Sequence, residues 1–300
     1  MAEYLAVDIG GSSIKYALVN EEEIVERGRK IQTPLDDIEE FLRILFQIYD
    51  RFADRIEGVA IAAPGRIDSR KGYFYHGGAL TYLYHMDLIS ILQTHIRCPI
   101  SIENDARCAA LAELWKGSMK DVKNGIVIVI GTGVGSALII DGKLYRGSHF
   151  SAGEAGNMVA VMNRPFYTDG TFGRFARSHA LLDTYADLRG IPYGEIGGKW
   201  FFQRANRGER AAREALREYA VAVTNGILSI QALLDLEKVA IGGGFSSEPL
   251  LLDCLKKELN DSYGRIDPHF ALECPELVFC EFGNDANLIG ALYHHLHPEE

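Results

Sequence analysis

Two glycine-rich turns stand where the chain could surround a phosphate group, at residues 8–13 (DIGGSS) and 131–135 (GTGVG). Glycines let the backbone approach a ligand closely, so that successive N–H groups can donate to phosphate oxygens. Asp8 cannot bind phosphate itself, but it can hold Mg²⁺ through water, and Lys15 adds a positive charge on the next predicted strand. A plain hairpin turn with a capping aspartate is the alternative for the first segment taken alone. The phosphate-binding candidates are Gly10, Gly11, Ser12, Lys15, Gly131, Thr132 and Gly133.

The second turn superficially resembles a dinucleotide-binding fingerprint. Such a fingerprint needs a helix after the turn and an acidic residue about 20 positions further on. Here a predicted strand, 136–140, follows instead, and Glu154 has the right spacing but lies in a loop, 151–156 (SAGEAG). The sequence therefore favours a phosphate-holding hairpin over a dehydrogenase site.

A third glycine run, 242–244, follows the short apolar strand 239–241 and precedes a helix. Backbone at Gly243 and Gly244 could lie flat against an adenine or a ribose. A strand-to-helix loop that needs a positive φ is the equally favoured alternative.

Glu103, Asn104 and Asp105 end a predicted strand immediately before a helix. In sheets of this type that position faces the crevice where ligands bind. Asp105 could take the proton from a hydroxyl group, and Asn104 could hydrogen-bond a sugar. A helix N-cap is the simpler interpretation, but phosphate turns in the same chain favour the base, because phosphoryl transfer requires positioning and one base.

Strand and helix patterns alternate along the chain and position these residues. Expected strands are 4–10, 13–20, 23–32, 56–62, 99–103, 125–130, 135–147 (two strands joined at Asp141-Gly142) and 238–241. Expected helices begin at Thr33-Pro34, as N-cap and first turn, and at Ala106, and cover 209–235 and 284–297.

The pattern restarts halfway along the chain. A shift of 120 residues lays 11–19 (GSSIKYALV) over 131–139 (GTGVGSALI), with both glycine-rich turns in the same place. This internal similarity predicts an α/β protein with two similar lobes facing each other across a central cleft.

Composition excludes several classes of partner. The formal net charge of −10 opposes nucleic-acid binding, and the arginines between 204 and 217 alternate with glutamates as on a solvated helix face. The five cysteines form no CxxC pair and indicate reduced thiols in a cytoplasmic protein. The longest apolar runs, such as 126–130, are too short for a membrane span, and no basic signal-peptide region opens the chain.

Taken together, the motifs resemble the ROK family of sugar kinases (repressor, open reading frame, kinase), within the actin/hexokinase/Hsp70 superfamily. The resemblance runs over nearly the whole chain. It rests on 8–15 (DIGGSSIK), 63–65 (APG), 103–106 (ENDA), 131–135, 151–156 and 242–244, in the family's order.

The resemblance implies an ATP- and Mg²⁺-dependent kinase with two ribonuclease-H-like lobes of the actin/hexokinase type. Residues 1–117 would form the lobe on the sugar and phosphate side, with a terminal helix at 284–300 packing back on it, and 118–283 would form the nucleotide-binding lobe. It further implies that Asp105 is the catalytic base, that the two turns hold phosphates and that Gly243 and Gly244 lie near the nucleoside. The expected sugar-binding residues are Gly65, Asn104, Asp105, Glu154 and Asn157.

The sequence departs from the family around residue 157. Family kinases usually have a histidine there, followed by a cysteine-rich zinc segment that ends near a sugar-binding glutamate. Here the histidine is Asn157, residues 158–176 contain no cysteine, and Ala176 stands near the expected glutamate. We therefore expect no structural zinc, and room for an aglycone beside the anomeric carbon. Candidates to stack on a second sugar, with core packing as the alternative, are Tyr82, Tyr84, Phe166 and Tyr167.

These departures favour phosphorylation of the C6 hydroxyl in a β-glucoside such as cellobiose. A kinase of free hexoses or N-acetylhexosamines stays open, as does a non-catalytic sugar-sensing regulator. Family repressors carry a helix-turn-helix ahead of the kinase core, and this sequence begins at the first strand. His294, His295 and His297 are interpreted as a frayed helix end rather than a metal site. A homodimer is an open alternative to a monomer.

Overall fold

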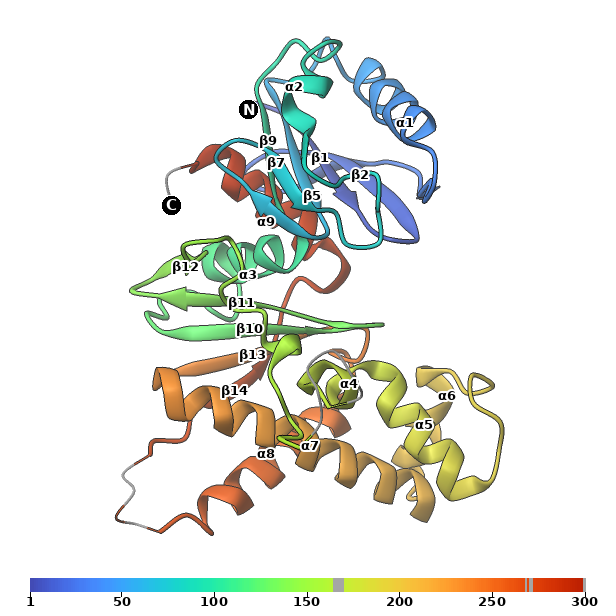
Figure 1. Ribbon diagram of the computed structural model, residues 1–300, viewed down its shortest axis with the longest axis vertical. Coiled ribbons are helices and arrows are strands. Elements are labelled where there is room, and N and C mark those ends of the chain that lie inside the picture. Colours follow the sequence, from blue (N-terminus) through green and yellow to red (C-terminus); the bar gives the residue numbers. More distant parts are fainter. Residues whose placement is uncertain (164–169, 268, 270–271, 299–300) are drawn as a thin grey trace. The chain divides into compact units, whose positions relative to one another are not determined.

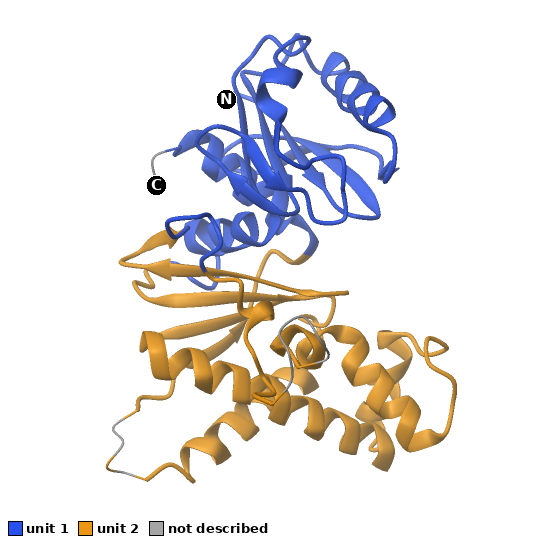
Figure 2. Ribbon diagram, viewed as in Figure 1, with its two compact units in different colours: residues 1–120, 146–152, 284–300 blue, residues 121–145, 153–283 orange. Residues whose placement is uncertain are grey.

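The computed structural model describes residues 1–163, 170–267, 269 and 272–298 (Figure 1). The chain divides into two compact units (Figure 2). Unit 1 comprises residues 1–120, 146–152 and 284–300, and unit 2 comprises 121–145 and 153–283. The segment 146–152, which the sequence analysis assigns to the second lobe, belongs to unit 1, because Arg146 and Phe150 bond to residues of that unit.

Unit 1 is built on a mixed sheet. Its strands lie in the order β3 (Ile24–Arg27), β2 (Ser13–Val19), β1 (Tyr4–Ile9), β5 (Gly58–Ala63), β9 (Ile100–Asn104), with β4 (Ile31–Gln32) also pairing with β2. The first three strands are antiparallel, whereas β1, β5 and β9 run parallel. Three parallel strands therefore end at one edge of the sheet, which is where ligands bind in folds of this kind.

Helices cover both faces of this sheet. Helices α1 (Ile38–Asp50) and α2 (Leu88–Leu92) pack on the face that carries Val59 and Ile61. Helices α3 (Asp105–Lys116) and α9 (Ala286–Leu296) lie side by side (Figure 1) and cover the opposite face, which carries Ala60 and Ala62. The alternation of the two residue sets along β5 is the two-residue period of a strand buried on both faces.

Helices α3 and α9 cross closely at Gly290. A Cβ atom at this position would lie 1.7 Å from the carbonyl oxygen of Cys108, so only glycine allows the two backbones to approach this far. The expected helix at 284–297 is confirmed, with α9 beginning at Ala286 after the 3₁₀ turn η3 (Gly283–Asp285).

The start of α1 differs from the sequence expectation. The N-cap is Asp37, whose side chain accepts the N–H of Glu40, and not Thr33. The Thr33 hydroxyl instead donates to the carbonyl of Gly10 over 2.6 Å. A threonine before a proline suits either role, and here its bond to the first glycine-rich turn replaces the capping bond.

A second, smaller sheet in unit 1 was not predicted. It consists of β6 (Arg66–Asp68), β7 (Tyr73–His76) and β8 (Met86–Asp87), all antiparallel. These strands are short and rich in glycine-flanked turns, so they carry little periodic signal.

The sheet of unit 2 repeats that of unit 1. Its strand order is β12 (Lys143–Tyr145), β11 (Val134–Ile140), β10 (Gly125–Ile130), β13 (Lys238–Gly243), β14 (Glu276–Phe279). Again the first three strands are antiparallel, and β10, β13 and β14 run parallel. The internal similarity found in the sequence is thus a repeat of sheet topology, and the α/β fold with two similar lobes is confirmed.

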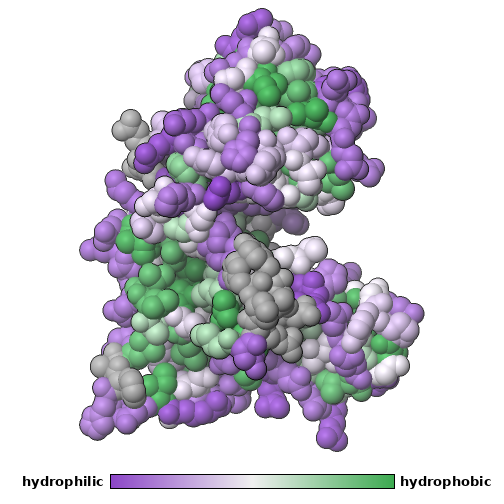
Figure 3. Space-filling model, viewed as in Figure 1, coloured by the Kyte–Doolittle hydropathy of each residue, from purple (hydrophilic) through white to green (hydrophobic). Residues whose placement is uncertain are grey.

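Helices fill the remainder of unit 2. They are η1 (Ala155–Asn157), α4 (Phe172–Ala176), α5 (Ser178–Arg189), α6 (Gly198–Asn206), α7 (Arg210–Leu234) and α8 (Pro249–Tyr263). Their apolar faces pack against Ile126, Ile128 and Ile130 of β10 in one core. Among the described residues, no helix combines the length and apolarity required to cross a membrane. The visible surface mixes polar and apolar side chains (Figure 3).

Candidate functional site

Most of the site residues predicted in unit 1 lie at the carboxyl ends of the parallel strands β1, β5 and β9. Asp8 pairs with Ala62 across β1 and β5, and Ala63 pairs with Asn104 across β5 and β9. The glycine-rich turn after β1, the Ala63-Pro64-Gly65 segment and the start of α3 therefore lie at neighbouring strand ends. Parallel pairing is what brings these distant parts of the sequence together.

Asn104 organises the candidate base. Its Nδ2 donates to the carbonyl of Gly65 over 3.0 Å and to Oδ1 of Asp105 over 3.1 Å, and its Oδ1 accepts the N–H of Arg107 as the N-cap of α3. Asp105 Oδ1 also accepts the N–H of Ala106 over 2.8 Å. The capping and catalytic interpretations therefore apply to adjacent residues: Asn104 is the cap, and Asp105, half-buried, is the first helical residue.

Gly65 is required by its backbone conformation. Its φ is +105°, and a Cβ atom would lie 2.0 Å from the carbonyl oxygen of His76. Because its carbonyl holds Asn104, this glycine has a structural role whether or not it contacts a sugar.

Asp8 is buried at the first turn, with 4% of its surface exposed. Its Oδ1 accepts from Nδ2 of Asn287 over 2.9 Å, and its Oδ2 accepts from Nζ of Lys15 over 3.3 Å. An ionised carboxylate has about four acceptor positions, so two stay available for a water molecule that is bound to Mg²⁺. The residues fit the indirect magnesium role, with Lys15 held at the same turn. Asn287 was missed because nothing in the sequence links α9 to residue 8.

A buried charge cluster lies next to the candidate base Asp105, and no sequence pattern predicted it. Glu103 has no exposed surface, and its Oε2 accepts from Nε of Arg146 over 2.7 Å. Nη1 of Arg107 lies 3.6 Å from Oε1 of Glu103, which also accepts the N–H of Asn104. Burial opposes ionisation of Glu103, but the charges of Arg146, His294 and Arg107 outweigh it and hold the pKa of this carboxyl below its ordinary value. The cluster fixes the backbone at Asn104.

In unit 2, the second glycine-rich turn joins β10 to β11, and the strand that follows it excludes a dinucleotide fingerprint. The N–H of Gly131 donates to the carbonyl of Gly133, and Ser178 donates from both its N–H and its hydroxyl to the carbonyl of Gly131. A Cβ atom at Gly133 would meet no atom of the described residues within 4 Å. This turn therefore faces open space, as a phosphate-holding turn requires.

The Gly242–Gly244 run divides into two roles. Gly243 has a φ of +97°, and a Cβ atom there would lie 2.0 Å from the carbonyl oxygen of Ile130, so this glycine is structurally required. At Gly244, a Cβ atom would have no neighbour within 4 Å in the part of the chain that the structure describes, and the Gly244 N–H donates to the carbonyl of Ile130 over 3.1 Å. Gly243 and Gly244 thus adjoin the end of β10, next to Gly131.

Glu154 lies in unit 2, in the loop 151–156 that leads into the short helix η1. Ser136 of β11 holds this loop. The Ser136 hydroxyl donates to the carbonyl of Gly153 and accepts the N–H of Ala155. Asn157 is exposed, and its N–H donates to the carbonyl of Glu154 over 3.0 Å. Within unit 2, the loop and the two glycine segments therefore all attach to the β10–β11 hairpin.

One expectation needs correction. His294 is buried and His295 bonds to Ser101, so these histidines are packed in unit 1 and do not form a frayed helix end. Ala176, which stands near the expected glutamate, is fully buried in the core of unit 2. Tyr82 packs on Phe41 and donates to the carbonyl of Pro34, which agrees with the core packing that was weighed against sugar stacking. Phe166 and Tyr167 lie outside the described residues.

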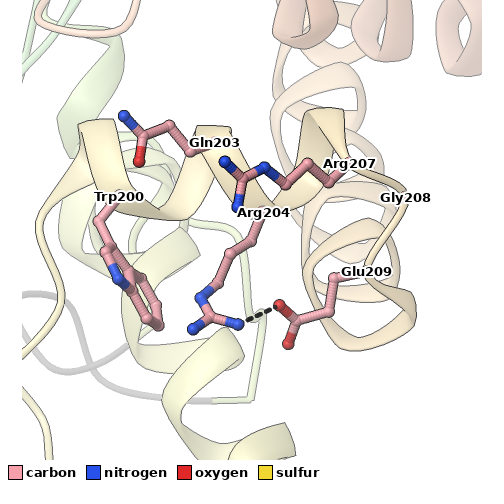
Figure 4. A pocket seen from close by; sticks show the side chains of 6 residues that line it. All are labelled: Trp200, Gln203, Arg204, Arg207, Gly208 and Glu209. Atoms are coloured by element: carbon pink, nitrogen blue, oxygen red, sulfur yellow. Dashed lines mark hydrogen bonds and ion pairs between the residues drawn. The ribbon is translucent and has the colours of Figure 1, made fainter.

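Figure 4 shows a pocket in unit 2 between α6 and the start of α7, lined by Trp200, Gln203, Arg204, Arg207, Gly208 and Glu209. Arg204 stacks on Trp200 and donates to Glu209, which holds the pKa of that carboxyl below its ordinary value. Arg204 and Glu209 are paired with each other, and the predicted site residues all lie elsewhere.

Known families and proteins are similar to this chain over nearly its whole length. The model of the ROK family matches residues 4–297. A β-glucoside kinase of Klebsiella pneumoniae is 32% identical over 302 residues, which cover 96% of this chain and 94% of that protein. An N-acetylmannosamine kinase of Haemophilus influenzae is 28% identical over 298 residues, which cover 96% and 94%.

Solved structures are similar over the same length. A ROK family protein from Streptococcus pneumoniae in complex with sucrose has a TM-score of 0.87 and 28% identity, with 99% of each chain covered. A ROK family glucokinase from Streptomyces griseus in complex with glucose and AMPPNP has a TM-score of 0.81 and 26% identity, with 97% of this chain and 98% of that chain covered.

Proposed function

The chain belongs to the ROK family and is an ATP-dependent sugar kinase, and on that premise we propose that it phosphorylates the C6 hydroxyl of the glucosyl unit in a β-glucoside such as cellobiose. The enzyme class follows from family membership. The choice of hydroxyl and of acceptor is the proposal.

Asp105 is the group that would accept the proton of the attacking hydroxyl. The amide of Asn104 and the N–H of Ala106 orient its carboxylate, so it need not be reorganised when the sugar arrives. Both amide hydrogens of Asn104 are already donated to protein acceptors, so its Oδ1 is the atom that would contact the sugar. The γ-phosphoryl group would then pass to the hydroxyl oxygen as its bond to the bridging β,γ-oxygen of ATP breaks and ADP leaves, and the proton would stay on Asp105.

The two glycine-rich turns would hold the phosphates of ATP through backbone N–H groups. Gly10 to Ser12 supply one turn and Gly131 to Gly133 the other, with Gly243 and Gly244 next to the nucleoside. Bound Mg²⁺ neutralises charge on the transferred phosphoryl group. Asp8 would hold a water molecule of its hydration shell, and Lys15 keeps this carboxylate in place.

The observation that carries the β-glucoside proposal is an aromatic pair next to the sugar side of unit 1. The rings of Tyr75 and Phe150 are stacked, with 6.2 Å between centroids and 26° between planes. Arg66, the neighbour of Gly65, lies over Tyr75 at 4.7 Å, and the carbonyl of Phe150 accepts from Arg107 of α3 over 2.8 Å. The pair is thus tied to both elements that carry the expected sugar-binding residues of this unit.

Further aromatic rings extend this pair into a partly exposed surface. Tyr73 bonds to His85 over 3.1 Å, and Tyr84, with 62% of its surface exposed, packs edge-on against His85. Aromatic faces pack well on the C–H face of a pyranose, and they lose little conformational entropy on binding. A second sugar ring would have such a surface available, whereas free glucose would leave it bare.

The test is the ratio of kcat/KM for cellobiose to kcat/KM for glucose, measured with ATP. We expect a ratio well above one for the natural sequence, and a fall of about tenfold in that ratio for Tyr75→Ala, about 1.4 kcal/mol of lost stacking. Tyr145→Ala removes an exposed aromatic outside this surface and serves as the matched control. A ratio of about one or below for the natural sequence contradicts the β-glucoside proposal.

Phosphorylation of an N-acetylhexosamine is the second candidate function. The N-acetylmannosamine kinase of Haemophilus influenzae is nearly as similar in sequence to this chain as the β-glucoside kinase is. N-acetylmannosamine in the same assay separates the two. A higher kcat/KM for it than for cellobiose would select this alternative.

A further inference from the structure

Unit 1 contains a pocket of 560 Å³ that none of the predicted catalytic residues lines. It lies at the amino end of β9, whereas Asn104 and Asp105 stand at the carboxyl end of that strand. Its walls come from the β6–β7 turn, α2, β9, the segment after β12 and the end of α9. The lining residues are Ser69, Arg70, Ile89, Ile100, Ser101, Arg146, His294 and Pro298. The volume is that of a site for a small organic molecule.

Two buried polar atoms in this lining lack a hydrogen-bond partner among the described residues. They are Oγ of Ser69, in a residue that is 6% exposed, and Nδ1 of His294, in a residue that is 3% exposed. Burial of an unsatisfied polar group costs about 1–3 kcal/mol, so native proteins rarely leave one without a reason. Two such atoms in residues that line one pocket point to a polar ligand there.

The charged groups in the lining are positive. Arg70 is exposed at the β6–β7 turn, and the side chain of Arg146 is 15% exposed. The neighbouring acids have basic partners: Glu103 accepts from Arg146, and Asp68 lies 3.9 Å from Nζ of Lys71. Two guanidinium groups with hydroxyl groups beside them form the donor set that binds multi-oxygen anions.

We propose that this pocket is a second ligand site of unit 1, which binds a small organic phosphate of the size of a sugar monophosphate. Arg70 and Arg146 would bind the phosphate oxygens, and Ser69 and His294 would gain the partners that they lack. The apolar side chains of Ile89 and Ile100 would pack on the carbon skeleton. No Phe, Tyr or Trp side chain lines the pocket among the described residues, so a nucleobase is a poorer fit than a sugar.

The inference goes beyond the proposed function, because none of the expected catalytic or phosphate-binding residues lines this pocket. Ser69 and Arg70 are the positions for a test, since Arg146 also holds Glu103 and its loss would disturb α3. Ser69→Ala removes a hydroxyl that has no partner, so the folded protein should keep its Tm or gain slightly. Loss of binding in that variant therefore cannot be attributed to unfolding.

The experiment is a calorimetric titration with glucose 6-phosphate in the presence of saturating cellobiose and glucose, which occupy the catalytic sugar site. We expect about one bound equivalent for the natural sequence and affinities at least about tenfold weaker for Ser69→Ala and Arg70→Gln, as loss of one charge-assisted bond predicts. Arg29→Gln, an exposed arginine of unit 1 outside the pocket, is the matched control and should bind as the natural sequence does.

Three results would overturn the proposal. One is the absence of binding to the natural sequence, and another is unchanged affinity in both variants, which would mean that water satisfies Ser69 and His294. The third is equally tight binding of inorganic phosphate, which would make the pocket a simple anion site without a place for the sugar. None of these results bears on the kcat/KM ratio, so failure here and failure of the β-glucoside proposal are separate.

Discussion

Arg146 donates from Nε to Oε2 of Glu103 over 2.7 Å, and the carboxylate that it holds is completely buried. The two residues are 43 positions apart, on a connecting segment and on β9. A buried carboxylate that loses a guanidinium partner keeps its desolvation cost without the compensating attraction.

The first prediction concerns this pair. Arg146→Met should destabilise the protein by about 3 kcal/mol, because Glu103 would lose its nearest guanidinium partner and keep the more distant Arg107. Chemical denaturation at neutral pH measures the free energy of unfolding. The double variant Glu103→Gln/Arg146→Met should recover part of the loss; if it is as unstable as the sum of the single variants, the two side chains are not energetically coupled.

The second prediction is that Asp105→Asn abolishes transfer while sugar binding persists. A positioned base contributes about 10²–10⁴ in rate, and the amide of asparagine can keep the contact with Ala106 but cannot take up a proton. Steady-state kcat and a sugar titration are the two measurements. A variant that keeps more than about a tenth of kcat would remove Asp105 from the role of base.

The third prediction separates ligand binding from folding in unit 2. Gly133→Val should weaken ATP binding far more than sugar binding, because the new side chain points into open space at the turn and the fold can accommodate it. Gly243→Ala is the contrasting control, since its Cβ would collide with the carbonyl of Ile130 and lower the Tm. Equal losses of ATP and sugar affinity in Gly133→Val would contradict the phosphate-turn assignment.

The fourth prediction is a pH dependence of stability. Burial lowers the pKa of His294 against the opposing attraction of Glu103. The unfolded chain therefore binds this proton at a higher pH than the folded chain does, and the free energy of unfolding falls as the pH drops below about 6.5. His294→Gln should flatten that slope by up to about 1.4 kcal/mol per pH unit. Denaturation curves between about pH 5 and 7.5 check it, and parallel slopes for the two proteins would contradict it.

The repeated strands were predictable because each is a short apolar run with a clear turn. The strand expected at 125–130 is β10 to the residue, and the turn at Asp141-Gly142 has the positive φ angles that this dipeptide favours. The position of Asn104 and Asp105 at a strand end also followed from the sequence, because local periodicity places strand and helix boundaries.

What the sequence did not reveal depends on contacts between distant residues. Asn287 approaches Asp8 across 279 positions, and Arg146 reaches Glu103 from a connecting segment. Neither arginine nor asparagine carries a local signal of such a partner. His294 looked like part of a polar chain end because burial by tertiary packing leaves no mark on the residues beside it.

The close packing of Gly290 on Cys108 also affects how the protein folds during its synthesis. Helix α9 is the last helix of the chain, yet it covers the face of the sheet formed by β1 and β5, near the beginning of the chain. During synthesis, this alanine-rich face and the Cys108 backbone are exposed until residues 286–296 have left the ribosome. Unit 1 begins with the first residues to be synthesised, but its sheet is covered only when α9 has been added. A chain that ends before Gly290 therefore leaves one face of that sheet exposed.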